Sequence, residues 1–362
     1  MKPHEKICYL GTWGGGWAMR SLFDLAVQYT TNGTRLHVDD ALLQSLERSE
    51  GLSAHRYALL LRELMGLHVT LPSPRLSRVR SIGGPLKPEQ LPPDALPEFW
   101  LDKLCDQLRT TRRSVMDCIS AVYAEDKHSY IDTDKLLQQW CFPFLAPRLG
   151  LSRTDHAGLD VKVTQLAAPC WRRWYQNGSR RARLLVAPNR YGFSDCRWLV
   201  CSVIHDGAHL LHMLSNPSAC DTSDPYKLAV METVAMVAER EVLATVEEGF
   251  RFEESIGPRF PTHTVQTMLL VGLFERSLRA IYDYEVHYHG EDPERWAQRM
   301  YSTYELELPL FGFATEFHGL PGLPSIYSVG PSAWATLSAD ERVSLLSGIG
   351  AEDFVTAALG SS

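Results

Sequence analysis

Apolar residues recur three and four positions apart along most of the chain, with polar residues between them. This spacing places the apolar side chains on one face of a helix and predicts a mainly α-helical protein. Helices are expected near residues 17–29, 39–49, 54–66, 97–124, 132–147, 197–214, 227–250, 262–288, 293–304, 338–347 and 351–358. Strand-like runs are few and short, near residues 7–10, 162–166 and 183–187. We therefore expect a helical fold with a small β element.

Proline-rich stretches at residues 71–75 and 85–97 interrupt the helical pattern. Proline disfavours the interior of a helix, so these stretches predict a long connection. The connection would separate an N-terminal helical portion, residues 1–95, from a catalytic portion, residues 96–362, unless the two form one continuous domain. A chain of 362 residues is long enough for either arrangement.

Composition and charge narrow the class of protein. Hydrophobic residues make up 45% of the chain and charged residues 22%, as in an ordinary soluble globular protein. The net charge of −7 gives no reason to expect a nucleic-acid partner, and no apolar run reaches the length of a membrane span. The eight cysteines are scattered without a Cys-x-x-Cys pair, which predicts reduced, mostly buried thiols and a cytoplasmic location.

Residues 205–209, His-Asp-Gly-Ala-His, carry the clearest chemical pattern. A spacing of four puts the imidazoles of His205 and His209 on one face of a helix, where they can share a metal ion. The pattern is that of the zinc-hydrolase motif His-Glu-x-x-His, with Asp206 in place of the catalytic glutamate. The chain has 13 histidines, so the prediction also depends on the acidic residue between the pair and on the apolar flanks. His212 is expected to pack in the core or to support a ligand.

A catalytic zinc site needs three protein ligands and keeps a fourth position open. Glu232 is the best candidate for the third ligand, because it lies near the start of a helical run over residues 228–250, which turn-forming residues separate from the histidine helix. Two antiparallel helices would bring Glu232 to the histidines. Glu239 lies two turns further along the same face and is expected to support a histidine or contact substrate. The implied cofactor is Zn²⁺.

These segments resemble the gluzincin metallopeptidases, and within them a bacterial group of uncharacterised domains related to carboxypeptidase Taq and the thimet-type oligopeptidases. Beside the histidine motif, residues 232–239 are similar to the group's Glu-Gly-Trp-Ala-Leu-Tyr-x-Glu segment. Residues 279–287 match an Arg-x-x-x-Asp-x-x-x-His helix, and residues 321–330 match a Pro-Gly-x4-Tyr-x2-Gly segment. The resemblance covers about residues 198–335.

The resemblance implies a gluzincin- or oligopeptidase-like helical fold in which a small β element lines the active-site cleft. It also implies a zinc-dependent hydrolase that acts on a peptide or small amide. Asp206 would be the general base for the metal-activated water. Three features depart from the family: the shorter Asp206, the plain spacing of four between the histidines, and the short chain. The fold and the metal site therefore carry over better than peptidase activity.

The resemblance assigns further roles near the C-terminus. Tyr327 and His287 match family positions that donate hydrogen bonds to the oxyanion formed during amide hydrolysis. Asp283 and Tyr284 lie on the same segment as His287 and are expected to contact substrate or to support the ligands. We expect one or two of the aromatic residues in this segment to take part in the chemistry, and the others to lie in the core or at the surface.

The strand-like run at residues 183–187 precedes the histidine helix. In gluzincins an edge strand in that position pairs with extended substrate through backbone hydrogen bonds, and the resemblance implies the same role here. Arg190 and Tyr191 would then reach the mouth of the cleft. A plain structural strand is the alternative interpretation.

Two functions of other classes stay open. In the first, His205 and Asp206 are paired ligands of an HD-type metal phosphohydrolase, with His156 and Asp283 as further ligands; this leaves Glu232 unexplained. In the second, the chain is a non-proteolytic metalloenzyme or a binding protein of a biosynthetic pathway, which the aspartate at position 206 favours. Metal analysis distinguishes the first alternative, because such phosphohydrolases favour iron or manganese. Assays with peptides and small amides distinguish the second.

Overall fold

The computed structural model describes residues 82, 86–124, 136–151, 160–165, 172–176, 181–186, 196–216, 224–258, 260–304 and 322–360. Most of these residues are helical, which confirms the prediction of a mainly α-helical protein. The helices expected near residues 17–29, 39–49 and 54–66 and the strand expected near 7–10 lie outside the described residues. Arg190, Tyr191 and His156 lie outside them as well.

Five long helices form the core of the fold: α5 (Pro97–Leu108), α9 (Cys196–Ser215), α10 (Pro225–Glu247), α12 (Thr262–Tyr282) and α15 (Leu323–Ala335). The other helices surround them: α6 (Val115–Ala124), α8 (Phe142–Arg148), α11 (Phe252–Ser255), α13 (Pro293–Tyr304), α16 (Ala339–Leu346) and α17 (Ala351–Gly360). Two π-helices, η6 (Leu136–Cys141) and η8 (Asp283–Tyr288), adjoin α8 and α12, and the 3-10 turns η4 (Pro88–Gln90) and η5 (Pro93–Ala95) precede α5.

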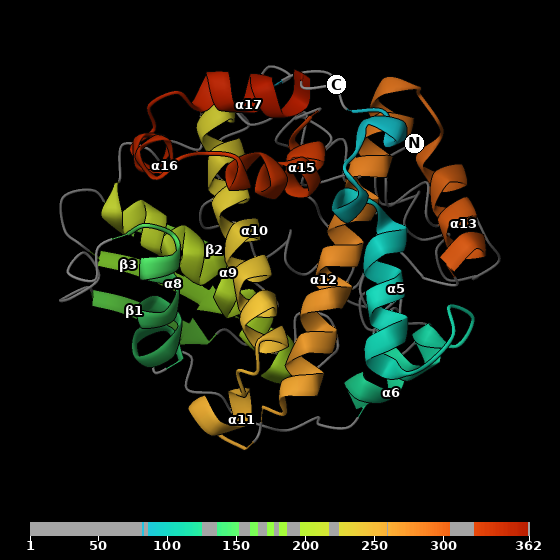
Figure 1. The fold of residues 1–362 in the computed structure, drawn as a ribbon, viewed down its shortest axis with the longest axis horizontal. Helices are drawn as coiled ribbons and strands as arrows, with labels where there is room; N and C mark the ends of the chain where they lie inside the picture. Colours follow the sequence, from blue (N-terminus) through green and yellow to red (C-terminus); the bar gives the residue numbers. More distant parts are fainter. Residues whose placement is uncertain are drawn as a thin grey trace, which may run out of the picture.

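Helix α10 is the central element (Figure 1). It packs against α8, α9, α12, α15 and α17, and every residue from Ala229 to Glu239 is buried. The start of the helix is fixed locally. The side chain of Asp224 accepts hydrogen bonds from the backbone N–H groups of Tyr226 and Lys227, and Pro225 occupies the first turn, where its missing N–H leaves no hydrogen bond unmade.

Helix α12 runs beside α10 and packs against α5, α9 and α15 (Figure 1). The helix expected over residues 262–288 is an α-helix that widens into the π-helix η8 at Asp283. The helix expected over residues 97–124 is two helices, because Arg109 adopts the left-handed conformation, with a φ of 50°, and ends α5.

Helix α15 forms over residues for which the sequence pattern predicts no helix. Its prolines weaken the local signal, although Pro324 lies in the first turn, where proline is tolerated. A tertiary contact caps this helix. The buried carboxylate of Asp283 accepts hydrogen bonds from the backbone N–H groups of Gly322 at 3.0 Å and Ser325 at 3.3 Å, and from the Ser325 hydroxyl at 2.7 Å. The end of α12 thereby fixes where α15 begins.

A three-stranded sheet packs beside α9 (Figure 1). It consists of β1 (Asp160–Gln165), β2 (Arg172–Gln176) and β3 (Arg181–Val186). β3 lies in the middle, parallel to β1 and antiparallel to β2. β1 and β3 overlap the strand-like runs at residues 162–166 and 183–187, whereas β2 has no counterpart among the expected strands. β2 packs against α9.

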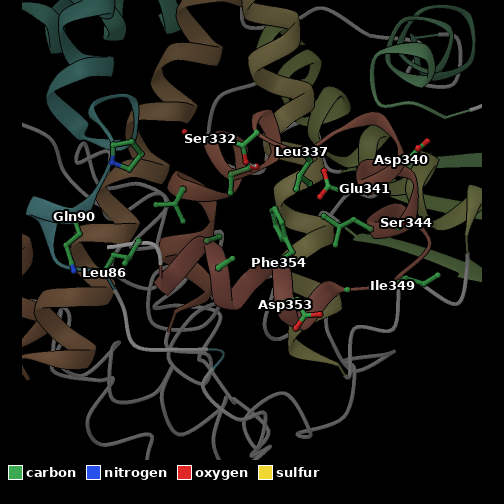
Figure 2. Close-up of a pocket in the computed structure, with 18 residues that line it drawn as sticks. Leu86, Gln90, Ser332, Leu337, Asp340, Glu341, Ser344, Ile349, Asp353 and Phe354 are labelled. Carbon is green, nitrogen blue, oxygen red and sulfur yellow. Dashed lines mark hydrogen bonds between the residues drawn. The ribbon is translucent and has the colours of Figure 1, made fainter.

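The C-terminal helices α16 and α17 close one end of the helical core. A pocket of about 740 Å³ lies between them, α15 and the segment before α5 (Figure 2). Apolar side chains such as Leu86 and Phe354 line it, and the exposed carboxylates of Asp340, Glu341 and Asp353 lie at its edge. Among the described residues, no single helix combines the length and apolarity needed to cross a membrane; α16 and α17 reach them only together, bent by 117°.

Candidate metal centre

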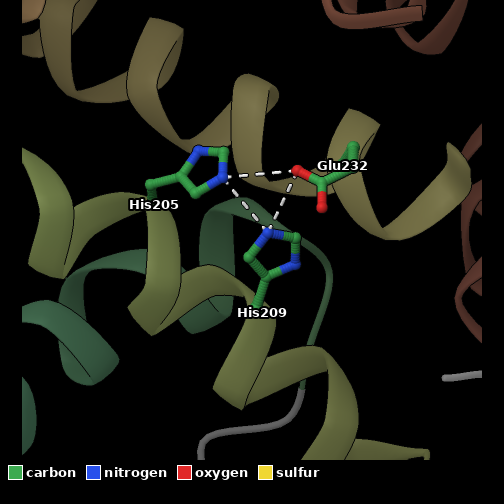
Figure 3. A group of neighbouring side chains, drawn as sticks. All are labelled: His205, His209 and Glu232. Atoms are coloured by element: carbon green, nitrogen blue, oxygen red, sulfur yellow. Dashed lines mark hydrogen bonds and ion pairs between the residues drawn. The ribbon is translucent and has the colours of Figure 1, made fainter. Parts of the chain in front are cut away.

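His205, His209 and Glu232 converge on one point between α9 and α10 (Figure 3). The Nε2 atoms of the two histidines are 3.2 Å apart. Oε2 of Glu232 lies 3.4 Å from Nε2 of His205 and 3.3 Å from Nε2 of His209. The structure therefore brings together the three residues that the sequence pattern predicted as metal ligands.

The spacing of these three atoms fits a tetrahedral zinc ion. Zinc binds histidine nitrogen and carboxylate oxygen at roughly 2.0–2.2 Å, which puts any two ligand atoms of a tetrahedron about 3.3 Å apart. The three observed separations, 3.2, 3.3 and 3.4 Å, all match that value. Two imidazole nitrogens and one carboxylate oxygen are also a donor set that zinc favours. The residues present thus fit the implied ion in both chemistry and size.

Helices α9 and α10 fix the positions of the three side chains through backbone geometry. His205 and His209 are four residues apart on α9, so their rings lie one turn apart on the face toward α10, with centroids 4.8 Å apart. His209 is fully buried, whereas His205 is partly accessible. The exposed fractions of the side chains are 13% for His205, 8% for Glu232 and 0% for His209, so His205 is the most accessible of the three.

Gly207 lies between the two histidines and lets α9 approach the π-helix η6. An ideal Cβ at this position would lie 2.5 Å from Sγ of Cys141 and 3.2 Å from Cδ2 of Leu137. Cys141 is a free, fully buried thiol, and burial raises its pKa. Its Sγ donates to the carbonyl oxygen of Val203, 3.5 Å away. The glycine in the motif therefore has a packing role on the side of α9 that faces η6.

Glu239 and Arg276 form a second layer behind His205. Oε1 of Glu239 lies 2.9 Å from Nδ1 of His205, and Oε2 of the same carboxylate lies 2.7 Å from Nη1 of Arg276. The expectation that Glu239 supports a histidine agrees with this arrangement. Arg276, on α12, was not found from the sequence, because it lies 37 residues after Glu239 and belongs to no recognisable spacing.

The charges around His205 act on its pKa in opposite directions. Burial and the positive charge of Arg276 lower the pKa, whereas the hydrogen bonds to Glu232 and Glu239 and the charge of Glu239 raise it, and the raising effects prevail. A proton on His205 would compete with a metal for the same nitrogen. Metal binding at this site is therefore expected to strengthen as pH rises.

Asp206 and His212 lie on the same helix outside the metal triad. Asp206, the expected general base, directly follows His205 and is 2% exposed. His212 is fully buried, and its Nε2 donates to the carbonyl oxygen of Leu346 at the end of α16, 3.0 Å away. Burial lowers the pKa of His212 to about 4, so the ring is neutral at pH 7. Of the two roles expected for His212, packing in the core or support of a ligand, the structure shows packing in the core.

The residues expected near the C-terminus fall into different surroundings. Tyr327 is buried on α15, and the guanidinium carbon of Arg279 lies 5.7 Å from the centre of its ring. Asp283 caps α15. Tyr284 stacks on the exposed Tyr288 with centroids 5.5 Å apart, and its hydroxyl lies 2.6 Å from Nε2 of the exposed His289. The backbone of residue 287 belongs to η8, but the position of the His287 side chain lies outside the described part of the chain.

Helix α15 also contacts α10 next to Glu232. A Cβ on Gly330 would overlap Oγ1 of Thr233, the residue after Glu232. Tyr327 precedes Gly330 by three residues, so the two share one face of α15. The pocket of Figure 2 is a separate feature, since none of the residues that line it belongs to the metal triad.

Comparisons with known proteins found no match to a protein-family model, to a curated protein or to a solved structure. The function is therefore argued from the geometry of the site.

Proposed function

We propose that the protein is a zinc-dependent hydrolase that acts on a peptide or small amide, with His205, His209 and Glu232 as the zinc ligands. The observation that carries the proposal is the convergence of three ligand atoms at separations of 3.2–3.4 Å, the spacing of a tetrahedral zinc site. A carboxylate on the far nitrogen of a ligating histidine, as Glu239 provides for His205, is a usual feature of such sites.

When bound, zinc polarises a carbonyl oxygen and lowers the pKa of water toward neutrality. The chain would supply the proton transfers and the stabilisation of charge. Asp206 would accept the proton of the attacking water as general base. Tyr327 and His287 would donate to the developing oxyanion. The close packing of Gly330 on Thr233 supports the role of Tyr327, because it holds this face of α15 against α10 beside Glu232.

The proposal includes a gluzincin-like arrangement in which the small sheet borders the substrate cleft. The contact between β2 and α9 supports it, because α9 carries both histidines. The HD-type phosphohydrolase is less compatible with the geometry. That mechanism needs a further aspartate ligand, and the residue suggested for it, Asp283, accepts hydrogen bonds from Gly322 and Ser325 at the start of α15.

The metal assignment is tested by elemental analysis of the purified protein. We expect about one zinc per chain, and each of His205→Ala, His209→Ala and Glu232→Gln should lose it, because three ligands leave no redundancy. His212→Gln is the matched control: it removes a buried histidine of the same helix and should keep the zinc. Full zinc occupancy in Glu232→Gln, or iron or manganese in the wild-type protein, would contradict the assignment.

The hydrolytic step is tested with a panel of peptides and small amides. Asp206→Asn keeps the size of the side chain and removes its basicity. The variant should therefore retain zinc, and its rate of hydrolysis should fall by roughly 100- to 10,000-fold, the range for loss of a general base. Retained hydrolysis in Asp206→Asn would reject Asp206 as the base. Zinc-loaded wild-type protein that hydrolyses nothing in the panel would favour the non-proteolytic alternative.

A further inference from the structure

We propose that Arg276 is a positioning residue of the metal centre, which acts through Glu239 to hold His205 in the orientation that binds metal. This inference rests on the proposed metal site. It extends that site to a third helix, α12, which contributes no ligand to the triad.

The contacts form an unbroken chain from α12 to the first ligand. Nη1 of Arg276 lies 2.7 Å from Oε2 of Glu239, and Oε1 of that carboxylate lies 2.9 Å from Nδ1 of His205. The other ring nitrogen of His205, Nε2, belongs to the metal triad. The side chain of Glu239 is 2% exposed and that of Arg276 is 18% exposed, so solvent screens this chain of contacts only weakly.

The protonation of the ring decides how Arg276 can act. A neutral histidine that binds metal through Nε2 carries its proton on Nδ1, and this N–H can donate to Glu239. Nη2 of Arg276 also lies 3.3 Å from Nδ1, but two N–H donors do not bond to each other. In the metal-binding tautomer, Arg276 therefore has a favourable interaction with Glu239 and none with the ring.

The sequence of α12 makes room for this guanidinium. Gly272 lies one turn before Arg276, and a Cβ at that position would lie 2.9 Å from Nη1 of Arg276. The side chain folds back along its own helix into the space that the glycine leaves. With Nη1 held there, Glu239 cannot rotate away from His205 without breaking its ion pair.

The neighbouring Arg240 provides a comparison within the same structure. It follows Glu239 in sequence and is also largely buried, but its guanidinium binds Asp94 and the carbonyl oxygen of Ser328. A buried arginine in this region therefore does not by itself contact the metal residues. The position of Arg276 on α12 is what directs it to Glu239.

The test is the dissociation constant for zinc, measured by competition with a chromophoric chelator on folded, apo-prepared protein. Glu239→Gln should weaken zinc binding by roughly 10–100-fold, the usual effect of removing a group that orients a ligand. Arg276→Lys should weaken it by about tenfold, because lysine cannot reproduce the fixed fork of the guanidinium. In the Glu239→Gln background, Arg276→Met should cause no further loss, since Arg276 acts only through the carboxylate.

The double variant also keeps the test independent of folding, because it replaces a buried ion pair by a neutral pair rather than leaving one charge alone. Arg240→Lys is the matched control and should bind zinc as the wild type does. Unchanged affinity in Arg276→Lys, or an equal loss from Arg276→Met with and without Glu239, would overturn the role of Arg276. A wild-type protein that binds no zinc would instead overturn the metal site itself.

Discussion

Replacement of Gly207 by alanine tests the packing of helix α9 most directly. The new Cβ would lie 2.5 Å from Sγ of Cys141, more than 1 Å inside a normal carbon–sulfur contact. The sulfur is held by its hydrogen bond to the carbonyl oxygen of Val203, so it cannot move away without a further cost. We therefore place the steric cost near the upper end of the overpacking range, about 3 kcal/mol.

Helix propensity acts in the opposite direction. Alanine is favoured over glycine inside a helix by about 1 kcal/mol, so Gly207→Ala should lower the free energy of unfolding by about 2 kcal/mol. Cys141→Ala alone removes a buried sulfur and should cost about 1 kcal/mol. In the double variant the new methyl group occupies the space of the sulfur. Its stability should therefore return to within about 1 kcal/mol of the wild type, a coupling of about 3 kcal/mol.

The assay is urea unfolding of the wild type, the two single variants and the double variant. The slope of the free energy of unfolding against urea concentration should be the same in all four. Gly360→Ala is the control, because a Cβ at that helical position meets nothing within 4 Å and should show no coupling to Cys141→Ala. Effects of the two substitutions that add within about 0.5 kcal/mol would refute the contact between α9 and η6. Loss of zinc binding in Gly207→Ala, regained in the double variant, would link this packing to the ligand positions.

Two further predictions concern the ends of α15 and α16. Asp283→Ala should lower the free energy of unfolding by about 3 kcal/mol, because it removes a helix cap and leaves buried N–H groups at the start of α15 without an acceptor. Urea unfolding measures this change, and a loss below about 1 kcal/mol would contradict the prediction. Burial lowers the folded-state pKa of His212 to about 4, so its protonation favours the unfolded chain. The neutral His212 ring therefore contributes to the free energy of unfolding fully above about pH 6.5, the pKa of histidine in the unfolded chain, and about 3 kcal/mol is lost as pH falls toward 4. His212→Gln should lack this pH dependence of unfolding. The same pH dependence in the wild type and in His212→Gln would refute the prediction.

The helices that carry the metal triad could be predicted from the sequence because their signals are local. Helix α9 has an apolar periodicity around the His205–His209 pair, and α10 has a proline and an aspartate cap at its start. The pattern over residues 228–250 predicted a helix, although it did not show that every residue from Ala229 to Glu239 is buried. Spacing along the two helices was then enough to nominate all three ligands.

The parts that could not be predicted depend on contacts between distant segments. Helix α15 begins where the Asp283 carboxylate, 39 residues before Gly322, accepts its first backbone hydrogen bonds. Arg276 reaches Glu239 only because α12 packs alongside α10. The close approach at Gly207 likewise needs η6, and the pattern predicted an ordinary helix over those residues. The spacing of residues within one segment does not predict these contacts between distant segments.

The enclosure of α10 has a consequence for how the protein trades stability against activity. Glu232 and Glu239 are the two charged residues in the buried stretch from Ala229 to Glu239. Moving a carboxylate out of water costs several kcal/mol, and a well-packed apolar side chain in its place is often neutral or stabilising. A sequence selected for folding alone would place leucine or methionine at both positions. Helix α10 thus carries two residues that cost stability, both on the side that faces the histidines of α9.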